Sequence, residues 1–340
     1  MSGGGRGGTR SERRPARASS DIDRAARIVR QGGIVAFPTE TVYGLGADAS
    51  NPLAVVQVFY VKKRPLSNPL ILHVADAERL ADWTREVPPK ARRLAERFWP
   101  GPLTLVLPKT SRVSDVVTAG LPHVAIRVPR HPVALELLRK AGCAIAAPSA
   151  NAFGCLSPTT AEHVRQQLGN AVDAVLDGGP CEHGIESTIV SFAGRSPAIL
   201  RLGAITTEAV EDCIGSVTQA LGPTQSVLAP GQYPKHYAPR TPLFLAPTPP
   251  SQPAFPPHRR VGLLAFGKRP RPGRWAQVEV LSARGLLAEA AADLYAALHR
   301  LDRAELDAIV AEQAPSRGLG PAINDRLRRA ACASEGIPAT

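Results

Sequence analysis

The sequence predicts an α/β protein with two domains. Short apolar runs of the length of buried strands occur between stretches that carry apolar residues at helical spacing, and the two kinds do not alternate strictly, which favours a mixed sheet. A proline-rich stretch without periodicity, at residues 221–257, divides the chain. A chain of 340 residues normally contains two domains, and a hydrophobic content of 44% is enough for real cores.

The expected elements follow in chain order. Strands are expected at residues 34–37, 70–74, 103–107, 124–128, 144–147, 172–176, 188–192 and 198–202. Helices are expected at residues 21–31, 53–61, 77–83, 89–98, 131–140 and 160–168. Beyond the proline-rich stretch, strands at 261–266 and 277–281 and helices at 285–300 and 321–332 predict a smaller α/β domain, while 304–310 fits either a strand or a helix.

These patterns predict four segments. Residues 1–20 are expected to be a disordered basic tail, 21–215 the main domain, 216–257 a linker or lid, and 258–340 the C-terminal α/β domain. No run approaches the roughly 18 apolar residues of a membrane span, so no membrane partner is expected. The five cysteines are widely spaced without a CxxC pair, which predicts free thiols in a reducing cytoplasm.

The formal net charge of +12 is compatible with a nucleic-acid partner. However, a third of the excess lies in the tail before residue 21, and a second basic cluster lies in the proline-rich part at 259–274. RNA contact and an ordinary basic surface therefore both remain open interpretations.

The most informative segment is GGIVAFPTETVYGLG at residues 32–46, followed by Lys62, Lys63 and Arg64. An apolar run ends at Pro38 in a loop rich in threonine and glycine, which is where an α/β sheet places a ligand site. The cations suit an anionic ligand. The sequence contains no P-loop motif, and no GxGxxG motif follows an expected strand. A bound nucleotide would therefore be held by cationic side chains, hydroxyls and turn amides.

The basic triplet at 62–64 admits two interpretations. Such triplets are usually solvated. Here Pro65 and the pair Asn68-Pro69 fix a rigid turn before the strand at 70–74, which favours a phosphate clamp between two buried elements. His73 lies inside that strand, and by itself it is more often a core histidine than a ligand.

Arg127 lies in the apolar run VAIRV, where a buried guanidinium needs a carboxylate partner. The partner could be structural, Asp48 or Glu40, or it could be the carboxylate of a substrate held by a bidentate fork. From the residues alone the two are equally supported.

Several polar residues lie at strand ends or in the linker. Ser149 and Asn151 follow one short expected strand, and Ser187 precedes another. Such residues are most often turn formers; the functional alternative is that they contact phosphate and amino-acid groups. Ser149 shows no His-Asp pattern, so a covalent nucleophile is not expected. The island from Tyr233 to Tyr237 either packs against a domain or forms a lid that excludes water.

The chain resembles a known family. FPTETVYGLG followed by KKRP, PSAN at 148–151, SPT at 157–159 and EST at 186–188 resemble the motifs of the YrdC-type L-threonylcarbamoyladenylate synthases. The linker APGQYPKHYAPRTP and the closing GLGPAINDRLRRAA resemble the long form of that family. The resemblance implies a YrdC-like domain with a twisted mixed sheet and flanking helices, plus a smaller Rossmann-like α/β C-terminal domain.

The resemblance also implies a reaction. L-Threonine, bicarbonate and ATP, the last with Mg²⁺, would give L-threonylcarbamoyladenylate and pyrophosphate, which is a nucleotidyltransferase reaction. The product would pass to the tRNA threonylcarbamoyl transferase complex, which modifies adenosine 37 of tRNA. Direct tRNA contact is left open.

Residue roles are carried over by motif. The resemblance implies that threonine is bound by Thr41, His73, Arg127 and Ser187. It implies that ATP is bound by Arg64, Asn68, Ser149, Asn151, Ser157, Arg201, Tyr233 and His236. Lys62 and Arg64 would be catalytic by offsetting charge on the leaving pyrophosphate, and no side chain would be a direct metal ligand.

Two competing functions are weighed. The first is a non-catalytic RNA-binding protein of tRNA or ribosome maturation, although aromatic residues are only 5% of the chain and show no stacking pattern. The second is the hydrogenase-maturation type of carbamoyl transferase, but its acylphosphatase-like domain and CxxC zinc sites are not visible in the sequence.

Overall fold

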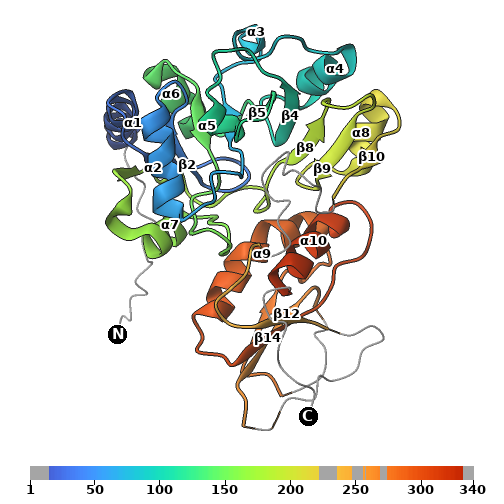
Figure 1. The fold of residues 1–340 in the computed structure, drawn as a ribbon. Coiled ribbons are helices and arrows are strands. Elements are labelled where there is room, and N and C mark those ends of the chain that lie inside the picture. The colour runs from blue at the N-terminus through green and yellow to red at the C-terminus, as the bar shows by residue number, and fades with distance from the viewer. Residues whose placement is uncertain (1–14, 222–235, 247–255, 257, 269–273, 332–340) are drawn as a thin grey trace, which may run out of the picture.

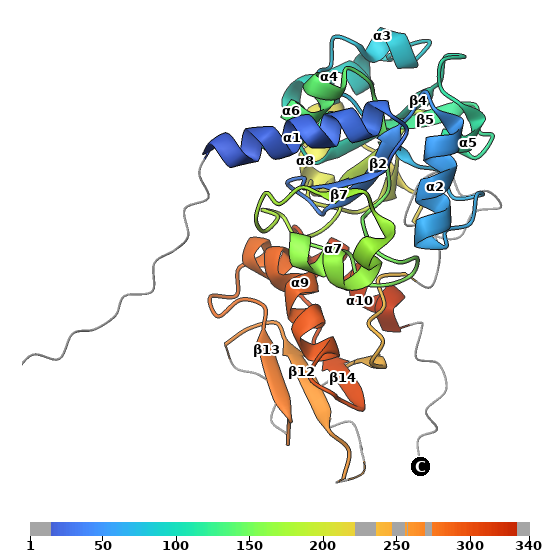
Figure 2. The same cartoon turned by 90° about the vertical axis from the view of Figure 1, so that its left-hand side faces the viewer.

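We describe the protein from a computed structural model, which describes residues 15–221, 236–246, 256, 258–268 and 274–331. A large α/β domain and a smaller one lie end to end (Figure 1). Helices α9 (Leu287–Asp302) and α10 (Gly320–Ala331) lie between the smaller sheet and the large domain in both views (Figures 1 and 2). The C-terminal helices are therefore the part of the small domain that meets the large one.

In the described part of the chain, ten strands form one sheet in the large domain. The sheet contains parallel pairs such as β3 with β5 and antiparallel pairs such as β4 with β5, so it is mixed, as predicted. Across the sheet the order is β10 (Thr218–Gln219), β9 (Ala198–Arg201), β8 (Thr188–Ser191), β4 (Leu103–Pro108), β5 (His123–Arg127), β3 (Ile71–His73), β6 (Ile145–Ala147), β2 (Gly44–Asp48), β1 (Val35–Phe37) and β7 (Ala174–Val175).

Helices flank this sheet. They are α1 (Pro15–Arg30), α2 (Pro52–Lys62), α3 (Leu80–Trp83), α4 (Pro89–Phe98), α5 (Asp115–Thr118), α6 (Pro132–Ala141), α7 (Ala161–Leu168), the 3-10 turn Gly169–Ala171 and α8 (Thr207–Ile214). Helix α2 begins where Asn51 accepts hydrogen bonds from the amides of Leu53 and Ala54, and Pro52 occupies the first turn, where a missing N–H costs nothing. The helix ends at Lys63, which adopts the left-handed conformation. This cap fixes where the basic triplet leaves the helix.

The small domain contains a parallel sheet in the order β11 (Leu243–Leu245), β14 (Ala308–Ala311), β12 (Val261–Ala265) and β13 (Gln277–Val280). For residues 304–310 the sequence fitted either a strand or a helix, and the structure has strand β14 from Ala308 onward. Apolar residues of α9 and α10 pack on one face of this sheet and share a core cluster with the large domain. The predicted smaller α/β domain is confirmed.

The expected segment boundaries differ from the structure at three places. Helix α1 begins at Pro15, inside the stretch expected to be a disordered tail, because alanine and arginine favour a helix and proline is tolerated in a first turn. Strand β10 extends the large sheet beyond residue 215, and β11, inside the expected linker, pairs with β14. Residues 1–14 of the expected tail lie outside the described residues.

Four further elements were not expected from the sequence: helices α5 and α8, the 3-10 turn Gly169–Ala171 and strand β2. The glycine-rich stretch after Pro38, expected to be a loop throughout, becomes strand β2 from Gly44. A Cβ at Gly46 would lie 2.3 Å from Cγ2 of Ile145 and 2.8 Å from Cε1 of Phe37, so the glycine allows β2 to lie tightly against its neighbours. None of the helices in the described residues combines the length and the apolar character that a membrane span requires.

Candidate active site

One pocket collects most of the residues that the sequence singled out. Its walls come from the loop after β1, from β3 and β5, from the turn after β6, from the ends of β8 and β9, and from the segment at 236–237. It is lined by Thr39, Thr41, Val42, Tyr43, Gly44, Arg64, Ile71, His73, Arg127, Ala147, Pro148, Ser149, Glu186, Ser187, Arg201, His236 and Tyr237.

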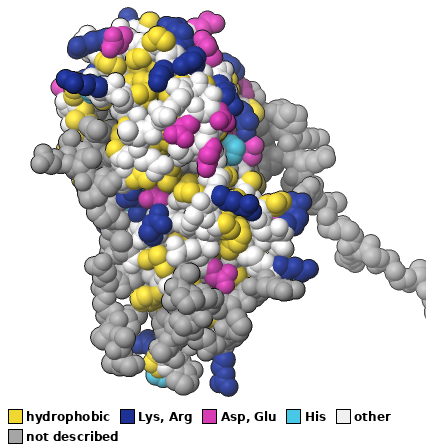
Figure 3. All heavy atoms as spheres, turned by 90° about the vertical axis from the view of Figure 1, so that its right-hand side faces the viewer, with side chains coloured by type: hydrophobic (Ala, Val, Ile, Leu, Met, Phe, Trp, Pro, Cys, Tyr) yellow, Lys and Arg dark blue, Asp and Glu magenta, His cyan; other side chains and the backbone are white. Residues whose placement is uncertain are grey.

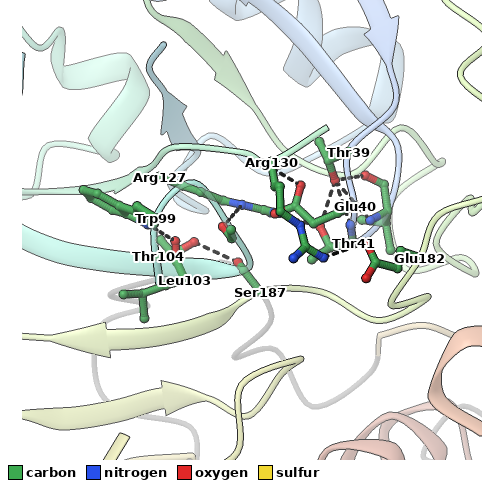
Figure 4. Close-up of polar contacts among 12 residues, drawn as sticks. Thr39, Glu40, Thr41, Trp99, Leu103, Thr104, Arg127, Arg130, Glu182 and Ser187 are labelled. Carbon is green, nitrogen blue, oxygen red and sulfur yellow. Dashed lines mark hydrogen bonds and ion pairs between the residues drawn. The ribbon is translucent and has the colours of Figure 1, made fainter. Parts of the chain in front are cut away.

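Arg127 reaches across the pocket wall from β5 to the loop after β1 (Figure 4). Its Nη2 lies 2.6 Å from Oε1 of Glu40, its Nη1 donates to the hydroxyl of Thr41 at 2.9 Å, and its Nε donates to the carbonyl of Gly101. Burial alone would raise the pKa of Glu40, but Arg127 outweighs it and holds that pKa below its ordinary value. Glu40, rather than Asp48, is thus the structural partner of Arg127.

Hydroxyl groups continue the same wall. The hydroxyls of Thr39 and Thr41 lie 2.8 Å apart, and Ser187 lies 2.8 Å from the hydroxyl of Thr104, as Figure 4 shows. Arg201, on β9, donates from Nη2 to the hydroxyl of Ser187 at 2.9 Å and from Nε to its carbonyl. Two guanidinium groups and several hydroxyls therefore converge from strands β4, β5 and β9, from the loop after β1 and from the residue before β8.

Arg64 forms the opposite side, just after α2. Its Nε donates to the carbonyl of Asn68 at 3.1 Å and its Nη2 to the carbonyl of Pro69 at 2.8 Å. The guanidinium is therefore held by the rigid turn that the prolines predicted. Asn68 is fully buried, and neither polar atom of its side chain has a hydrogen-bond partner among the residues that the structure describes.

Lys62, expected to be catalytic, does not lie in the wall of the pocket. It is buried, and its Nζ donates to the carbonyl of Ser149 at 2.6 Å and to the carbonyl of Asn151. Burial and the nearby Arg64 lower the pKa of this ammonium. Lys62 does not line the pocket; it holds the turn at 148–151, whose Ser149 does.

The two histidines in the pocket wall are neutral. Burial and then Arg127 lower the pKa of His73 to about 3, and its ring packs edge-on against Phe37. Burial and the cations Arg64 and Lys62 also lower the pKa of His236 well below its ordinary value. Nδ1 of His236 and the hydroxyl of the adjoining Tyr237 are buried, and within the described part of the chain neither has a hydrogen-bond partner. Buried polar atoms of this kind normally find partners, so a ligand would satisfy them.

Glu186 is a pocket residue whose partners belong to both domains. Its carboxylate accepts a hydrogen bond from Ser157 at 2.6 Å, and its Oε2 lies 2.9 Å from Nε of Arg326 on α10. The hydroxyl of Tyr295, on α9, lies 3.1 Å from both carboxylate oxygens. The small domain thus contacts the pocket wall directly.

The structure brings together eight of the predicted site residues around this pocket: Thr41, Arg64, His73, Ser149, Arg127, Ser187, Arg201 and His236. The buried Lys62, Asn68, Asn151 and Ser157 are not among its lining residues. Tyr233 lies outside the described residues.

Sequence reasoning missed Glu186 and Tyr237 as pocket residues, although both lie in motifs that it singled out. The available signal was the acidic residue in EST, because a carboxylate directly before a buried strand needs a cation near it. Its cation, Arg326, is 140 residues away and could not be assigned from spacing.

The fold is that of an α/β protein, and among the described residues three guanidinium groups and one carboxylate, that of Glu186, line its pocket, an arrangement that suits an anionic small molecule. Two family descriptions match the chain: "Telomere recombination" over residues 27–203 and "Threonylcarbamoyl-AMP synthase, C-terminal domain" over residues 205–332.

Individual relatives agree with both matches. The threonylcarbamoyl-AMP synthase of Bacillus subtilis is 44% identical over 320 residues, which covers 91% of this chain and 92% of that protein. The one from Pyrococcus abyssi is 39% identical and covers 90% and 92%. The crystal structure of P. abyssi Sua5 complexed with L-threonine superposes with a TM-score of 0.84 at 38% identity, covering 92% and 94% of the chains. The chain belongs to the two-domain threonylcarbamoyl-AMP synthase family.

Proposed function

We propose that the protein condenses L-threonine, bicarbonate and ATP to threonylcarbamoyl-AMP and pyrophosphate. The observation that carries this proposal is a pocket in which Arg64, Arg127 and Arg201 converge with hydroxyl groups around a space bounded by two neutral histidines. A carboxylate, a carbamate and a triphosphate are all anionic, so such a wall suits each of them. Relatives that align over nine-tenths of the chain carry the name of this activity.

We assign the threonine end to Thr41, His73, Arg127 and Ser187. Nη2 of Arg127 is paired with the carboxylate of Glu40, and its Nη1 donates to the hydroxyl of Thr41. Neutral His73 offers an imidazole without adding charge. The P. abyssi Sua5 structure is a complex with L-threonine, and this complex supports a threonine subsite in the fold that the two proteins share.

We assign the ATP end to Arg64, Ser149, Arg201 and His236, with Asn68, Asn151 and Ser157 beside them. The side-chain amide of Asn68 and Nδ1 of His236 are buried and find no partner among the described residues, so a nucleotide can satisfy them. Mg²⁺ enters as the complex with ATP and is bound through phosphate oxygens. The proposal that Tyr233 binds ATP rests on the sequence motif alone.

The chemistry needs positioning and charge neutralisation. The amine of threonine and bicarbonate form a carbamate with loss of water; a carbamate oxygen then forms a bond to the α-phosphorus as the bond to the leaving pyrophosphate breaks. Arg64 and Arg201 offset the charge that develops on the phosphates, and no covalent enzyme intermediate is required. We propose that Lys62 acts indirectly, by holding the turn that presents Ser149.

This activity places the protein among nucleotidyltransferases. Its product, a mixed anhydride, would be consumed by the transferase complex that modifies tRNA adenosine 37, and the cytoplasm is the compartment where we expect both. On the face shown in Figure 3, Lys and Arg side chains are interspersed with acidic and apolar ones. The described residues drawn on that face form no continuous basic stripe for a tRNA.

The test is pyrophosphate release from ATP by the purified protein, with and without L-threonine and bicarbonate, in the presence of Mg²⁺. We expect release that requires both threonine and bicarbonate, that falls sharply in Arg64→Ala and that persists in Lys63→Ala, the exposed neighbour. A folded protein that binds ATP and RNA without threonine-dependent release would refute the proposal and favour the non-catalytic RNA-binding function.

A further inference from the structure

The contact between the two domains is built around one carboxylate. Glu186 is 4% exposed and Arg326 is 1% exposed, and they meet at 2.9 Å. Nη2 of Arg326 also donates to the carbonyl of Leu202 at 2.7 Å, and its guanidinium lies 5.0 Å from the centroid of the Tyr237 ring. Arg326 therefore contacts two parts of the pocket wall, Glu186 and Tyr237, without lining the pocket itself.

The charges around Glu186 come from every element that packs against it. Arg326 and its acidic neighbour Asp325 come from α10, Tyr295 from α9, and Arg201 from β9. Burial alone would raise the pKa of Glu186, but Arg326 and then Arg201 outweigh it and keep that pKa below its ordinary value. The carboxylate is therefore ionised in the wall of a pocket for anions.

We propose that Arg326 and Tyr295, both from the C-terminal domain, are positioning residues that neutralise and orient Glu186 so that the pocket accepts an anionic nucleotide beside Ser187 and Arg201. The identity of the anion as ATP rests on the proposed function. A regulatory or folding role of the domain alone would not require its cation to reach a pocket residue.

The physical reason is charge balance. With Arg326 in place, Glu186 is paired, and Arg201 lines the pocket with its Nη2 on the hydroxyl of Ser187. Without Arg326, the same carboxylate would compete for Arg201 and would repel a phosphate, because a buried charge that loses its partner is screened only weakly. Tyr295 adds two hydrogen bonds to Glu186 but no charge, so its loss should matter less.

The experiment measures ATP binding by calorimetry, without turnover, in the full-length protein. Arg326→Met should raise the dissociation constant for ATP on the order of 30-fold. The double variant Glu186→Gln with Arg326→Met removes the uncompensated charge and should recover most of that loss. Tyr295→Phe should weaken binding by only a few fold. Arg328→Met, at an exposed arginine on the same helix, is the matched control and should bind ATP like the unaltered protein.

A pH series separates a charge effect from a purely structural one. In Arg326→Met, Glu186 loses the cation that lowers its pKa most, so that pKa should rise and ATP binding should strengthen as the pH falls, relative to the double variant at each pH. Both variants lack Arg326, so loss of packing is common to them. Their ratio at each pH isolates the Glu186 carboxylate from the protonation of ATP itself.

If Glu186→Gln does not restore ATP binding to Arg326→Met, or if the two variants show the same pH dependence, the proposal is wrong and Arg326 only holds the domains together. Should Arg326→Met fail to fold, the double variant compared with Glu186→Gln and with Tyr295→Phe still tests whether a neutral residue 186 makes the cation dispensable. Because binding is measured without threonine, this outcome is independent of whether pyrophosphate release supports the proposed reaction.

Discussion

Arg127 and Glu40 form an ion pair of 2.6 Å in which both side chains are at least nine-tenths buried. The pair ties β5 to the loop after β1, and the guanidinium still lines the pocket. One side of Arg127 thus has a structural role, and the other side remains available for a ligand. The pairing with Glu40 confirms the structural partner that the sequence analysis weighed, while binding of a substrate carboxylate by the same guanidinium stays a prediction.

Arg127→Lys tests the threonine subsite. A lysine keeps the charge but loses the planar fork that serves Glu40, Thr41 and a ligand together, so we expect the KM for threonine to rise about tenfold or more while the KM for ATP changes little. Steady-state pyrophosphate release measures both constants. Arg130→Lys, at the exposed ion pair with Glu182, is the control. A rise in the KM for ATP instead would place Arg127 at the nucleotide.

Lys62→Met tests whether the lysine holds the turn at 148–151. Two backbone carbonyls would lose their buried donor, so we expect the free energy of unfolding to fall by about 1–3 kcal/mol and ATP binding to weaken through Ser149. Lys63→Met, at the exposed neighbour, should stay within about 0.5 kcal/mol. Urea denaturation measures both. Unchanged stability combined with lost turnover would instead support direct contact between Lys62 and the substrate.

Stability should fall in mild acid. Burial, helped by neighbouring cations, lowers the pKa of His73 and of His163 to about 3, and burial lowers that of His299 to about 4. The unfolded chain takes up these protons below about pH 6.5 whereas the folded chain does not. Stability is therefore full above that pH and is lost as the pH falls towards the folded pKa values, by about 1.4 kcal/mol per pH unit for each histidine.

Urea denaturation between pH 6 and 5 measures this slope, in a window above the titration of Glu40 and Glu186. His163→Asn removes one ring of the stacked His163–His299 pair and should reduce the slope by about 1.4 kcal/mol per pH unit. His258→Asn, at an exposed position, should not change it. A His163→Asn slope equal to that of the unaltered protein would show that this histidine is protonated in the folded state.

Gly184 tests the docking of the two domains. Its φ is +67°, and a Cβ there would lie 2.3 Å from the carbonyl oxygen of Ala292 on α9. Gly184→Ala should therefore push α9 away and expose the interface to limited proteolysis. Gly179→Ala is the matched control, because Gly179 has a similar φ of +82° with nothing within 4 Å of the added Cβ. Its cost should be only the left-handed strain of about 1–2 kcal/mol. Equal proteolysis of the two variants would contradict tight docking at Gly184.

Local sequence patterns were sufficient to predict those helices and strands that are specified by their own residues. Helices α2, α4, α6 and α7 and strands β1, β3, β4 and β5 lie where apolar periodicity and turn residues placed them. Strand β2 escaped prediction because its glycines, which indicate a loop in isolation, are required by the close approach of Ile145 and Phe37. Helix α1 began earlier than expected because a basic, glycine-rich tail masks the helical propensity of residues 15–20.

By itself the sequence determined the α/β class, the two domains, the motifs that place the chain in its family, and the need of Arg127 for a carboxylate. Only the tertiary structure decided that this carboxylate is Glu40, that Lys62 holds a turn instead of lining the pocket, and that Arg326 reaches Glu186 across 140 residues of chain. The physical reason is that periodicity records which residues are buried, whereas the pairing of buried charges depends on which strands and helices become neighbours in the folded protein.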